Sequence, residues 1–171
     1  MRIIGIDPGS HRVGYAVLSF PEANRSKPEL LVYGTIEVAP KTPSPDNLLQ
    51  IKEELDGILQ EYKPDFGSVE ELFFLKNVTT GMRVSESRGV ILLSLGEKKI
   101  PAVQPSATQI KKGISAKGNA SKKEVRQAIK LILGFNNLTG HDDSWDAIAA
   151  AFVGKSLIHG LVQVKRKSSN T

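Results

Sequence analysis

The sequence predicts an α/β protein built on a mixed five-stranded sheet, antiparallel over its first three strands and flanked by helices. Three observations support this fold class. Three apolar runs separated by turn residues open the chain. Short apolar segments then alternate with stretches in which apolar residues recur at helical spacing. The 171 residues show no internal repeat or linker and suit one compact domain.

The first three predicted strands form a meander. Residues 2–7 are an apolar run that stops at a carboxylate, and a Pro-Gly-Ser turn leads into a second strand over residues 13–20. After a polar stretch, residues 30–38 form a third strand rich in β-forming residues. Strands joined in direct succession in this way are expected to pair antiparallel.

Helices and two short strands follow the meander. A helix is predicted over residues 46–62, with Asp46 as its N-cap. The further predicted elements are a strand over residues 66–74, a helix over 77–98, a strand over 101–104, a helix opening at Ser121 and a helix over 142–159. Ser121 and Glu124 have the spacing of a capping box. Trp145 is assigned to the core.

Composition narrows the class of protein. The absence of cysteine excludes disulfides, thiolate zinc sites and a cysteine nucleophile, and it fits a reducing bacterial cytoplasm. The N-terminal apolar run is too short for a signal peptide and no run approaches membrane-spanning length, so no membrane partner is expected. Residues 1–162 are assigned to the single domain and residues 163–171 to a basic tail predicted to be disordered. A net charge of +5 favours polyanionic partners only weakly.

Two carboxylates stand at the ends of predicted strands. Asp7 ends the first strand before the Pro-Gly turn, where a turn-forming role is an equally good interpretation. Glu70 ends a short buried run, where an unpaired charge would cost several kcal/mol. A lysine, an arginine or a divalent cation could neutralise it. Glu71 competes with Glu70, but strand alternation sends it to the opposite face.

A second acidic group opens the last predicted helix. Asp143 and Asp146 are three residues apart and share a face. Acidic residues in a first turn also complement the helix dipole, which by itself accounts for Asp142 and Asp143. Asp146 heads an apolar stripe that continues to Leu157, so it is expected to point toward protein and to need a partner.

The four carboxylates Asp7, Glu70, Asp143 and Asp146 could converge on two Mg²⁺ ions, which are hard cations that prefer oxygen ligands, with Mn²⁺ as a substitute. Two such ions suit phosphodiester hydrolysis, because one activates the attacking water and the other stabilises the leaving oxygen. The pattern therefore predicts a metal-dependent nuclease site.

The order of these motifs resembles the RuvC family of Holliday junction resolvases. The matching segments are Gly5 to Ser10 with Gly14-Tyr15, then Pro64-Asp65, Glu70, Phe73, Lys76-Asn77 and Arg88-Gly89-Val90, and finally Asp143 with Asp146-Ala147. Together they cover the chain from Met1 to about Leu161. The ordered set is far more specific than any one piece.

The resemblance implies an RNase H-like fold, a homodimer, and divalent-metal cleavage of two opposed strands of a four-way DNA junction during recombination and repair. The family's acidic tetrad carries over onto the four carboxylates named above. Asp142 is an extra carboxylate, and some family members use histidine in this neighbourhood, so His141 and Asp142 stay alternatives to Asp143 as the third ligand. RuvA and RuvB branch-migration proteins are candidate partners on the same resemblance.

Cations concentrate between residues 111 and 130. The DNA-binding candidates in this stretch are Lys111, Lys117, Lys122, Lys123 and Arg126. Every fourth residue from 122 to 130 is cationic, which could line up with a phosphate backbone, although a solvated helix face explains it equally well. Residues 112–119 mix glycines with lysines and predict a flexible cationic loop. In the family, the positions matching Lys111 and Lys122 are implicated in DNA binding and activity.

Phe73, Phe74 and Lys76 complete the DNA-binding candidates. The family has an aromatic residue at the place of Phe73 that can stack on an unpaired base, and Phe74 could substitute for it. Such stacking is typically worth about 1–3 kcal/mol. The commoner arrangement for adjacent phenylalanines is that one belongs to the core and the other is incidental.

Three alternatives stay open. The opening turn also resembles the phosphate loop of the sugar kinase and actin superfamily, but those proteins need two such domains and this chain supplies one. A YqgF-like nuclease would share Asp7 and the Arg12-Val13-Gly14 pattern, but we find no later Asp-Glu-Arg block of its kind. A non-catalytic junction-binding or RNA-binding protein of the same fold would keep the acidic cluster for structure.

Overall fold

The computed structural model describes residues 1–21, 27–39, 41–72, 78–134 and 139–168, with side chains for all of these except residues 78, 79 and 161–168. The strands are β1 (Arg2–Asp7), β2 (Arg12–Ser19), β3 (Glu29–Glu37), β4 (Phe66–Val69) and β5 (Ala102–Val103). The helices are α1 (Asp46–Tyr62), α2 (Val78–Glu97), α3 (Ala107–Ser115), α4 (Lys122–Leu133) and α5 (Asp142–Ser168).

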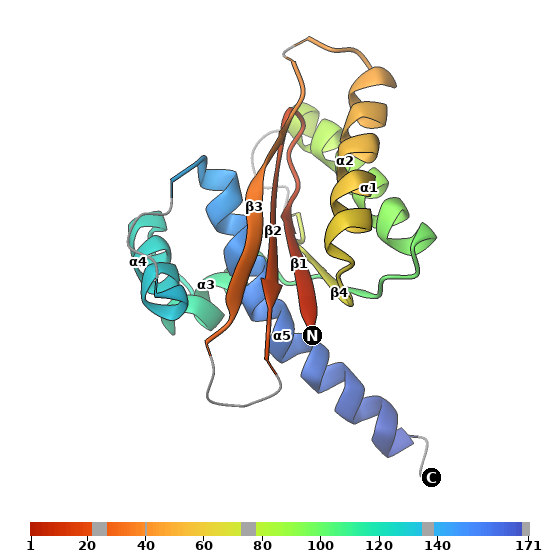
Figure 1. The fold of residues 1–171 in the computed structure, drawn as a ribbon. Coiled ribbons are helices and arrows are strands. Elements are labelled where there is room, and N and C mark those ends of the chain that lie inside the picture. The colour runs from red at the N-terminus through yellow and green to blue at the C-terminus, as the bar shows by residue number, and fades with distance from the viewer. Residues whose placement is uncertain (22–26, 40, 73–77, 135–138, 169–171) are drawn as a thin grey trace.

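The strands form one mixed sheet in the order β3-β2-β1-β4-β5 (Figure 1). β1, β2 and β3 pair antiparallel, whereas β4 pairs parallel with both β1 and β5. This topology confirms the predicted five-stranded sheet with an antiparallel beginning.

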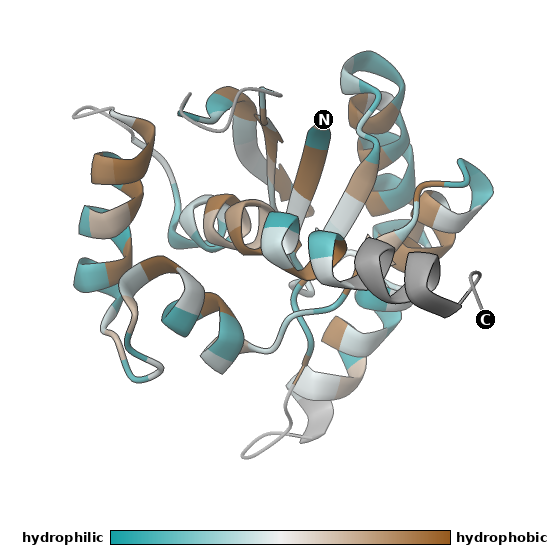
Figure 2. Cartoon of the chain, turned by 90° about the horizontal axis from the view of Figure 1, so that it is seen from below, coloured by the Kyte–Doolittle hydropathy of each residue, from teal (hydrophilic) through white to brown (hydrophobic). Residues whose placement is uncertain are grey.

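Helices cover both faces of the sheet and create two separate cores. α1 and α2 lie on one face, and α3, α4 and α5 lie on the other (Figure 1). Side chains of β1 contribute to both cores, because successive residues of a strand point to opposite faces of the sheet. Ile4 and Ile6 pack under α1 and α2, while Ile3 faces the α5 side. Figure 2 shows β1 as hydrophobic along its middle and the helices as carrying both hydrophobic and hydrophilic residues, as amphipathic cover requires.

α5 lies directly against the centre of the sheet because glycines remove the side chains that would separate them. A Cβ atom on Gly5 of β1 would lie 2.0 Å from the Ala147 carbonyl oxygen. The hydroxyl of Ser68 in β4 donates a buried hydrogen bond of 2.7 Å to the Ala150 carbonyl. The same face of the helix buries small residues, including Ala147 and Ala151. These contacts fix where the first turn of α5 sits above the sheet.

The structure contains one helix that the sequence analysis did not predict. α3 takes up the first part of the expected cationic loop and leaves only residues 116–121 outside helices. A capping box starts this helix, and the buried Ile110 and Ile114 anchor it one turn apart. Gly113 fits within it because α5 passes close by, where an added Cβ would lie 2.7 Å from a methyl carbon of Val153.

Three predicted boundaries also differ. Asp46 is the first residue of α1 and not its N-cap, which is Pro45 and provides no side-chain hydrogen bond. β4 ends at Val69, so the predicted strand to residue 74 was too long. α5 continues to Ser168, past the predicted end at residue 159, because no proline interrupts it. Its backbone is thus helical over part of the segment predicted to be disordered, and the domain boundary at residue 162 stays a prediction.

The predicted capping box of α4 and the burial of Trp145 are both confirmed. Within the described ranges, no helix combines the length and apolar character needed to cross a bilayer.

Candidate acidic active site

Asp7 and Glu70 leave adjacent strands at the same edge of the sheet. β1 and β4 run parallel, with Ile6 opposite Val69, and the backbone N–H of Glu70 donates to the Ile6 carbonyl at 3.0 Å. Both carboxylates are therefore carried by the ends of parallel neighbours, the usual place for a site on such a sheet. On α2, Arg88 donates to the Glu70 carbonyl at 3.2 Å and so helps to fix the chain just after β4.

Burial makes these two carboxyl groups unusually weak acids. It raises the pKa of Asp7 from 3.8 to about 8, and repulsion from Glu70 and Asp146 adds to the effect. Burial and the charge of Asp146 raise the pKa of Glu70 from 4.5 to about 7. Such shifts mean that neither charge is fully compensated by the protein.

The first turn of α5 brings Asp143 and Asp146 to the same edge. A Cβ atom on Gly14, which faces Asp7 across β1 and β2, would lie 2.0 Å from the Asp143 carbonyl oxygen. The Asp143 and Asp146 side chains are 32% and 34% exposed. Burial raises the pKa of Asp146, as expected for the partly enclosed carboxylate that the sequence predicts. The other three predicted carboxylates thus all raise the pKa of Asp7.

These carboxylates are nevertheless not gathered around a point. Among the described residues, no group of three or more histidine or acidic side chains stands close enough together to hold a metal ion. Two of them are instead drawn toward cations, Asp143 toward Arg12 and Asp146 toward Lys122, each at 3.9 Å. A cation shared by three of the carboxylates would therefore require side chains to turn inward.

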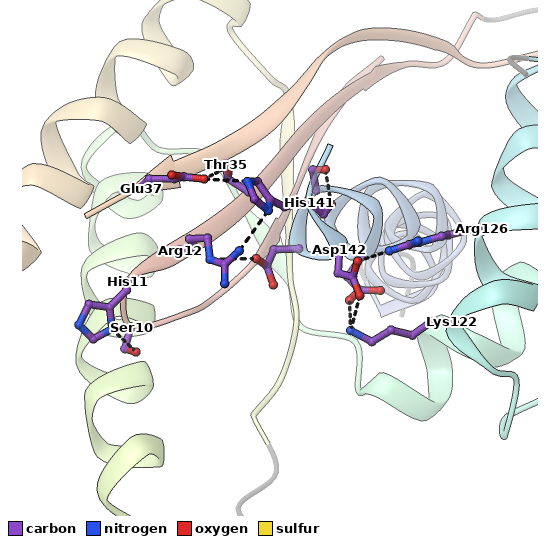
Figure 3. Close-up of polar contacts among 12 residues, drawn as sticks. Ser10, His11, Arg12, Thr35, Glu37, Lys122, Arg126, His141 and Asp142 are labelled. Carbon is purple, nitrogen blue, oxygen red and sulfur yellow. Dashed lines mark hydrogen bonds and ion pairs between the residues drawn. The ribbon is translucent and has the colours of Figure 1, made fainter. Parts of the chain in front are cut away.

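The carboxylate of Asp142, at the start of α5, is paired with cations of α4. Lys122 of α4 donates to its carboxylate at 3.1 Å, and Arg126 also pairs with it (Figure 3). The hydrogen bond from Lys122 lowers the pKa of Asp142. Arg126 in addition lies over the Trp145 ring, 5.7 Å from its centroid. Asp142 is therefore a partner of the α4 cations, and it shares Lys122 with Asp146, which lies 3.9 Å from the same ammonium group.

His141 is also engaged elsewhere. Its Nδ1 lies 3.1 Å from Nη1 of Arg12, and its Nε2 lies 3.1 Å from a carboxylate oxygen of Glu37 on β3 (Figure 3). The third acidic position stays open among Asp142, Asp143 and His141, and Asp143 is the one of the three whose charge raises the pKa of Asp7.

The predicted DNA-binding cations fall into two groups. Lys111 and Lys122 lie near the carboxylates, since both lower the pKa of Glu70. Lys117 follows α3 and pairs with Glu124 at 3.5 Å, and Lys123 lines a surface pocket of about 410 Å³ with Arg126. The candidates Phe73, Phe74 and Lys76 lie outside the described residues.

Sequence reasoning missed three contributors to this site. Arg12 was noted only as part of a motif, although it contacts Asp143. Gly5 and Gly14 were not identified as the positions where α5 touches the sheet. The glycines are visible in the motifs that frame Asp7, but their partner helix lies far away in the sequence.

The donor chemistry of the site fits a divalent cation. The candidate ligands Asp7, Glu70, Asp143 and Asp146 are all carboxylates, which supply the oxygen ligands that Mg²⁺ prefers. Burial, followed by repulsion among the carboxylates, raises the pKa values of Asp7 and Glu70, so a bound cation would stabilise their charged forms. A mixed sheet of this order with an acidic, lysine-flanked edge defines the class of protein, a nuclease of RNase H-like fold.

Comparison with known proteins identifies the family. Residues 3–154 match the family described as Crossover junction endodeoxyribonuclease RuvC. A protein of that name from Petrotoga mobilis is 41% identical over 152 residues, which cover 89% of this chain and 91% of the relative. One from Finegoldia magna is 40% identical over 151 residues, covering 88% and 90%. The chain belongs to the RuvC family of crossover junction endodeoxyribonucleases, which are metal-dependent nucleases.

Solved structures agree with this assignment. Thermus thermophilus RuvC in complex with Holliday junction substrate superposes with a TM-score of 0.85 at 25% identity, covering 93% of this chain and 96% of that one. The Thermus thermophilus RuvC structure alone gives 0.82 at 26% identity, covering 90% and 92%. The yeast mitochondrial Holliday junction resolvase Ydc2, 17% identical with a TM-score of 0.62 and coverage of 92% and 80%, shares the fold.

Proposed function

We propose that this chain resolves four-way DNA junctions by paired, metal-dependent hydrolysis of phosphodiester bonds on two opposed strands, in recombination and repair. The observation that carries the proposal is the set of carboxylates at the β1, β4 and α5 ends, beside Lys111 and Lys122. Relatives named crossover junction endodeoxyribonuclease, and a relative in complex with Holliday junction substrate, support the choice of substrate.

In the proposed mechanism, Asp7, Glu70, Asp143 and Asp146 hold two Mg²⁺ ions, for which Mn²⁺ can substitute. When bound, such ions supply an activated water and charge stabilisation for the leaving oxygen. Lys122 lowers the pKa values of Asp7, Glu70 and Asp146 and so offsets part of the rise that burial causes, and bound cations would favour the charged carboxylates further. Lys122 also offsets charge that develops on the phosphate during cleavage.

The DNA would lie across this edge and along the cations beside it. Lys111 and Lys122 act at the cut phosphate, and Lys117, Lys123 and Arg126 contact the backbone further along. For Phe73, Phe74 and Lys76, the proposal rests on the family resemblance alone, with Phe73 or Phe74 stacking on an unpaired base.

A homodimer follows from the same proposal, because two sites related by a twofold axis match two opposed strands of a junction. RuvA and RuvB are candidate partners, and the bacterial cytoplasm is the candidate location because the relatives come from bacteria. Sedimentation at micromolar concentration should give a dimer.

The decisive experiment is cleavage of a synthetic four-way junction in Mg²⁺. Asp7→Asn and Asp143→Asn should abolish cutting and preserve junction binding. Asp142→Asn is the matched control, because it removes a neighbouring carboxylate that pairs with α4 cations. It should retain cutting within about tenfold of the native protein.

Two results would change the assignment. Undiminished cutting by Asp7→Asn would contradict the proposed site. Binding of junctions with no cutting in Mg²⁺ or Mn²⁺ by the native protein would favour the alternative of a non-catalytic junction or RNA binder, and cutting of other DNA structures in preference to junctions would favour a YqgF-like nuclease.

A further inference from the structure

Arg12 occupies the side of the acidic site opposite Lys122. It opens β2 and reaches the start of α5, where its Nη1 lies 3.1 Å from Nδ1 of His141 and its Nε lies 3.9 Å from the carboxylate of Asp143. Figure 3 shows Arg12 on the β2 side of the first turn of α5 and Lys122 on the α4 side. The Arg12 side chain is 52% exposed.

A chain of polar contacts holds this arginine in place. Glu37 of β3 accepts a hydrogen bond from the Thr35 hydroxyl at 3.2 Å and lies 3.1 Å from Nε2 of His141. A carboxylate at Nε2 favours the tautomer that carries its hydrogen there, which leaves the lone pair of Nδ1 to accept from Arg12. Residues of β3, β2 and the start of α5 thus cooperate to orient one guanidinium.

The ion pair between Arg12 and Asp143 does not explain why Arg12 is held in place. A 3.9 Å ion pair between partly exposed groups typically contributes less than about 1 kcal/mol. A separate role for the His141 ring does not explain it either, because its Nδ1 is engaged with Arg12 and its Nε2 with Glu37. Nη2 of Arg12 donates to no protein oxygen in the part of the chain that the structure describes, so the guanidinium retains donors facing the solvent.

We propose that Arg12 binds a non-bridging oxygen of the DNA backbone on the β2 side of the acidic site, as the counterpart of Lys122 on the α4 side. This inference rests on the proposed function and deepens it. A guanidinium with free donors matches a phosphate in shape and charge, and its preorganisation by His141 and Glu37 reduces the entropy lost on binding. Two cations on either side of the carboxylates would seat the strand across them.

The test is the salt dependence of junction binding in EDTA, where no cutting occurs. Arg12→Ala should weaken binding about tenfold and reduce the slope of log affinity against log salt by about 1, as expected for the loss of one phosphate contact. Arg12→Lys should keep most of the slope because it keeps the charge. His141→Ala should weaken binding by a smaller factor and leave the slope close to that of the native protein.

Arg2→Ala is the matched control. Arg2 begins β1 at the opposite end from Asp7, about 17 Å away along the strand, and its side chain donates to the Tyr62 carbonyl. Removing this charge should leave the slope unchanged. Thermal unfolding of each variant checks that the fold is retained, which the exposure of Arg12 favours.

An unchanged slope and affinity for Arg12→Ala would overturn the proposal. The proposal would also be overturned if the only defect of Arg12→Ala were altered Mn²⁺ binding, measured by calorimetry without DNA, because Arg12 would then act through Asp143. Failure of native protein to bind junctions would contradict both proposals. Native protein that binds junctions without cutting them would contradict the proposed function alone, since the Arg12 comparison needs only binding.

Discussion

Replacement of Asp7 by asparagine is expected to stabilise the metal-free protein. In the unfolded chain this carboxyl ionises near its ordinary pKa of 3.8, whereas burial and the neighbouring carboxylates raise the pKa in the folded protein to about 8. Between these values the folded protein holds a proton that the unfolded chain has released. Stability is therefore lost as pH rises from about 4 to about 8. An asparagine side chain carries no charge in this range, so the Asp7→Asn variant should lack this loss.

The size of the effect follows from the same pKa values. Each pKa unit corresponds to about 1.4 kcal/mol, so the shift costs the folded protein at most about 4 kcal/mol at pH 7 and about 2 kcal/mol at pH 5. The actual free-energy cost is smaller than these upper limits, because side chains of the site relax and water reaches the carboxylate. We expect Asp7→Asn to gain about 2–3 kcal/mol at pH 7 and about 1 kcal/mol at pH 5.

Urea unfolding in EDTA at the two pH values measures this difference. Asp46→Asn, an exposed aspartate in the first turn of α1, is the control and should change stability by less than about 0.5 kcal/mol at either pH. Mg²⁺ should stabilise the native protein and have little effect on Asp7→Asn, because one ligand is lost. A variant less stable than the native protein at pH 7, or a gain that does not grow with pH, would refute the reasoning.

Three further predictions concern the frame and the DNA surface. Gly5→Ala should unfold the protein or cost more than about 4 kcal/mol in denaturation experiments, because the new Cβ would overlap the backbone of α5, whereas Gly57→Ala on α1 meets no neighbour and should stabilise by up to about 1 kcal/mol. Ser121→Ala removes the cap of α4 and should cost about 1 kcal/mol by urea unfolding, and an unchanged midpoint would contradict it. Lys122→Ala and Lys123→Ala should each weaken junction binding and reduce its salt slope by about 1; a slope like that of the native protein would remove α4 from the interface.

The sequence predicted the sheet well because its signals are local. The apolar runs of β1, β2 and β3 are separated by turn residues, and each strand found its expected place and direction. α3 was missed because glycine and lysines obscured its two buried isoleucines. Its glycine makes sense only when α5 lies against it, and that contact is invisible from a single segment of sequence.

The sequence predicted which carboxylates lie at this edge of the sheet, but it did not predict which side chains pair with them. Asp142 and Asp143 are adjacent in a first turn, where dipole arguments treat them alike. The fold separates them, because α4 supplies cations to Asp142 while β2 supplies Arg12 to Asp143. Which cation each of two neighbouring carboxylates meets thus depends on elements far from both in the sequence.

Lys122 has two roles that its substitution would affect in opposite directions. It lowers the pKa values of Asp7, Glu70 and Asp146, and so offsets part of the rise that burial causes. It also holds Asp146 at 3.9 Å, a contact that a bound cation would have to displace. Without Lys122 the metal-free site would lose a competitor for the Asp146 carboxylate, and its carboxylates would bind protons more tightly. Metal affinity should then fall at pH 6, where protonation dominates, and approach or exceed that of the native protein at pH 9, where the carboxylates ionise unaided.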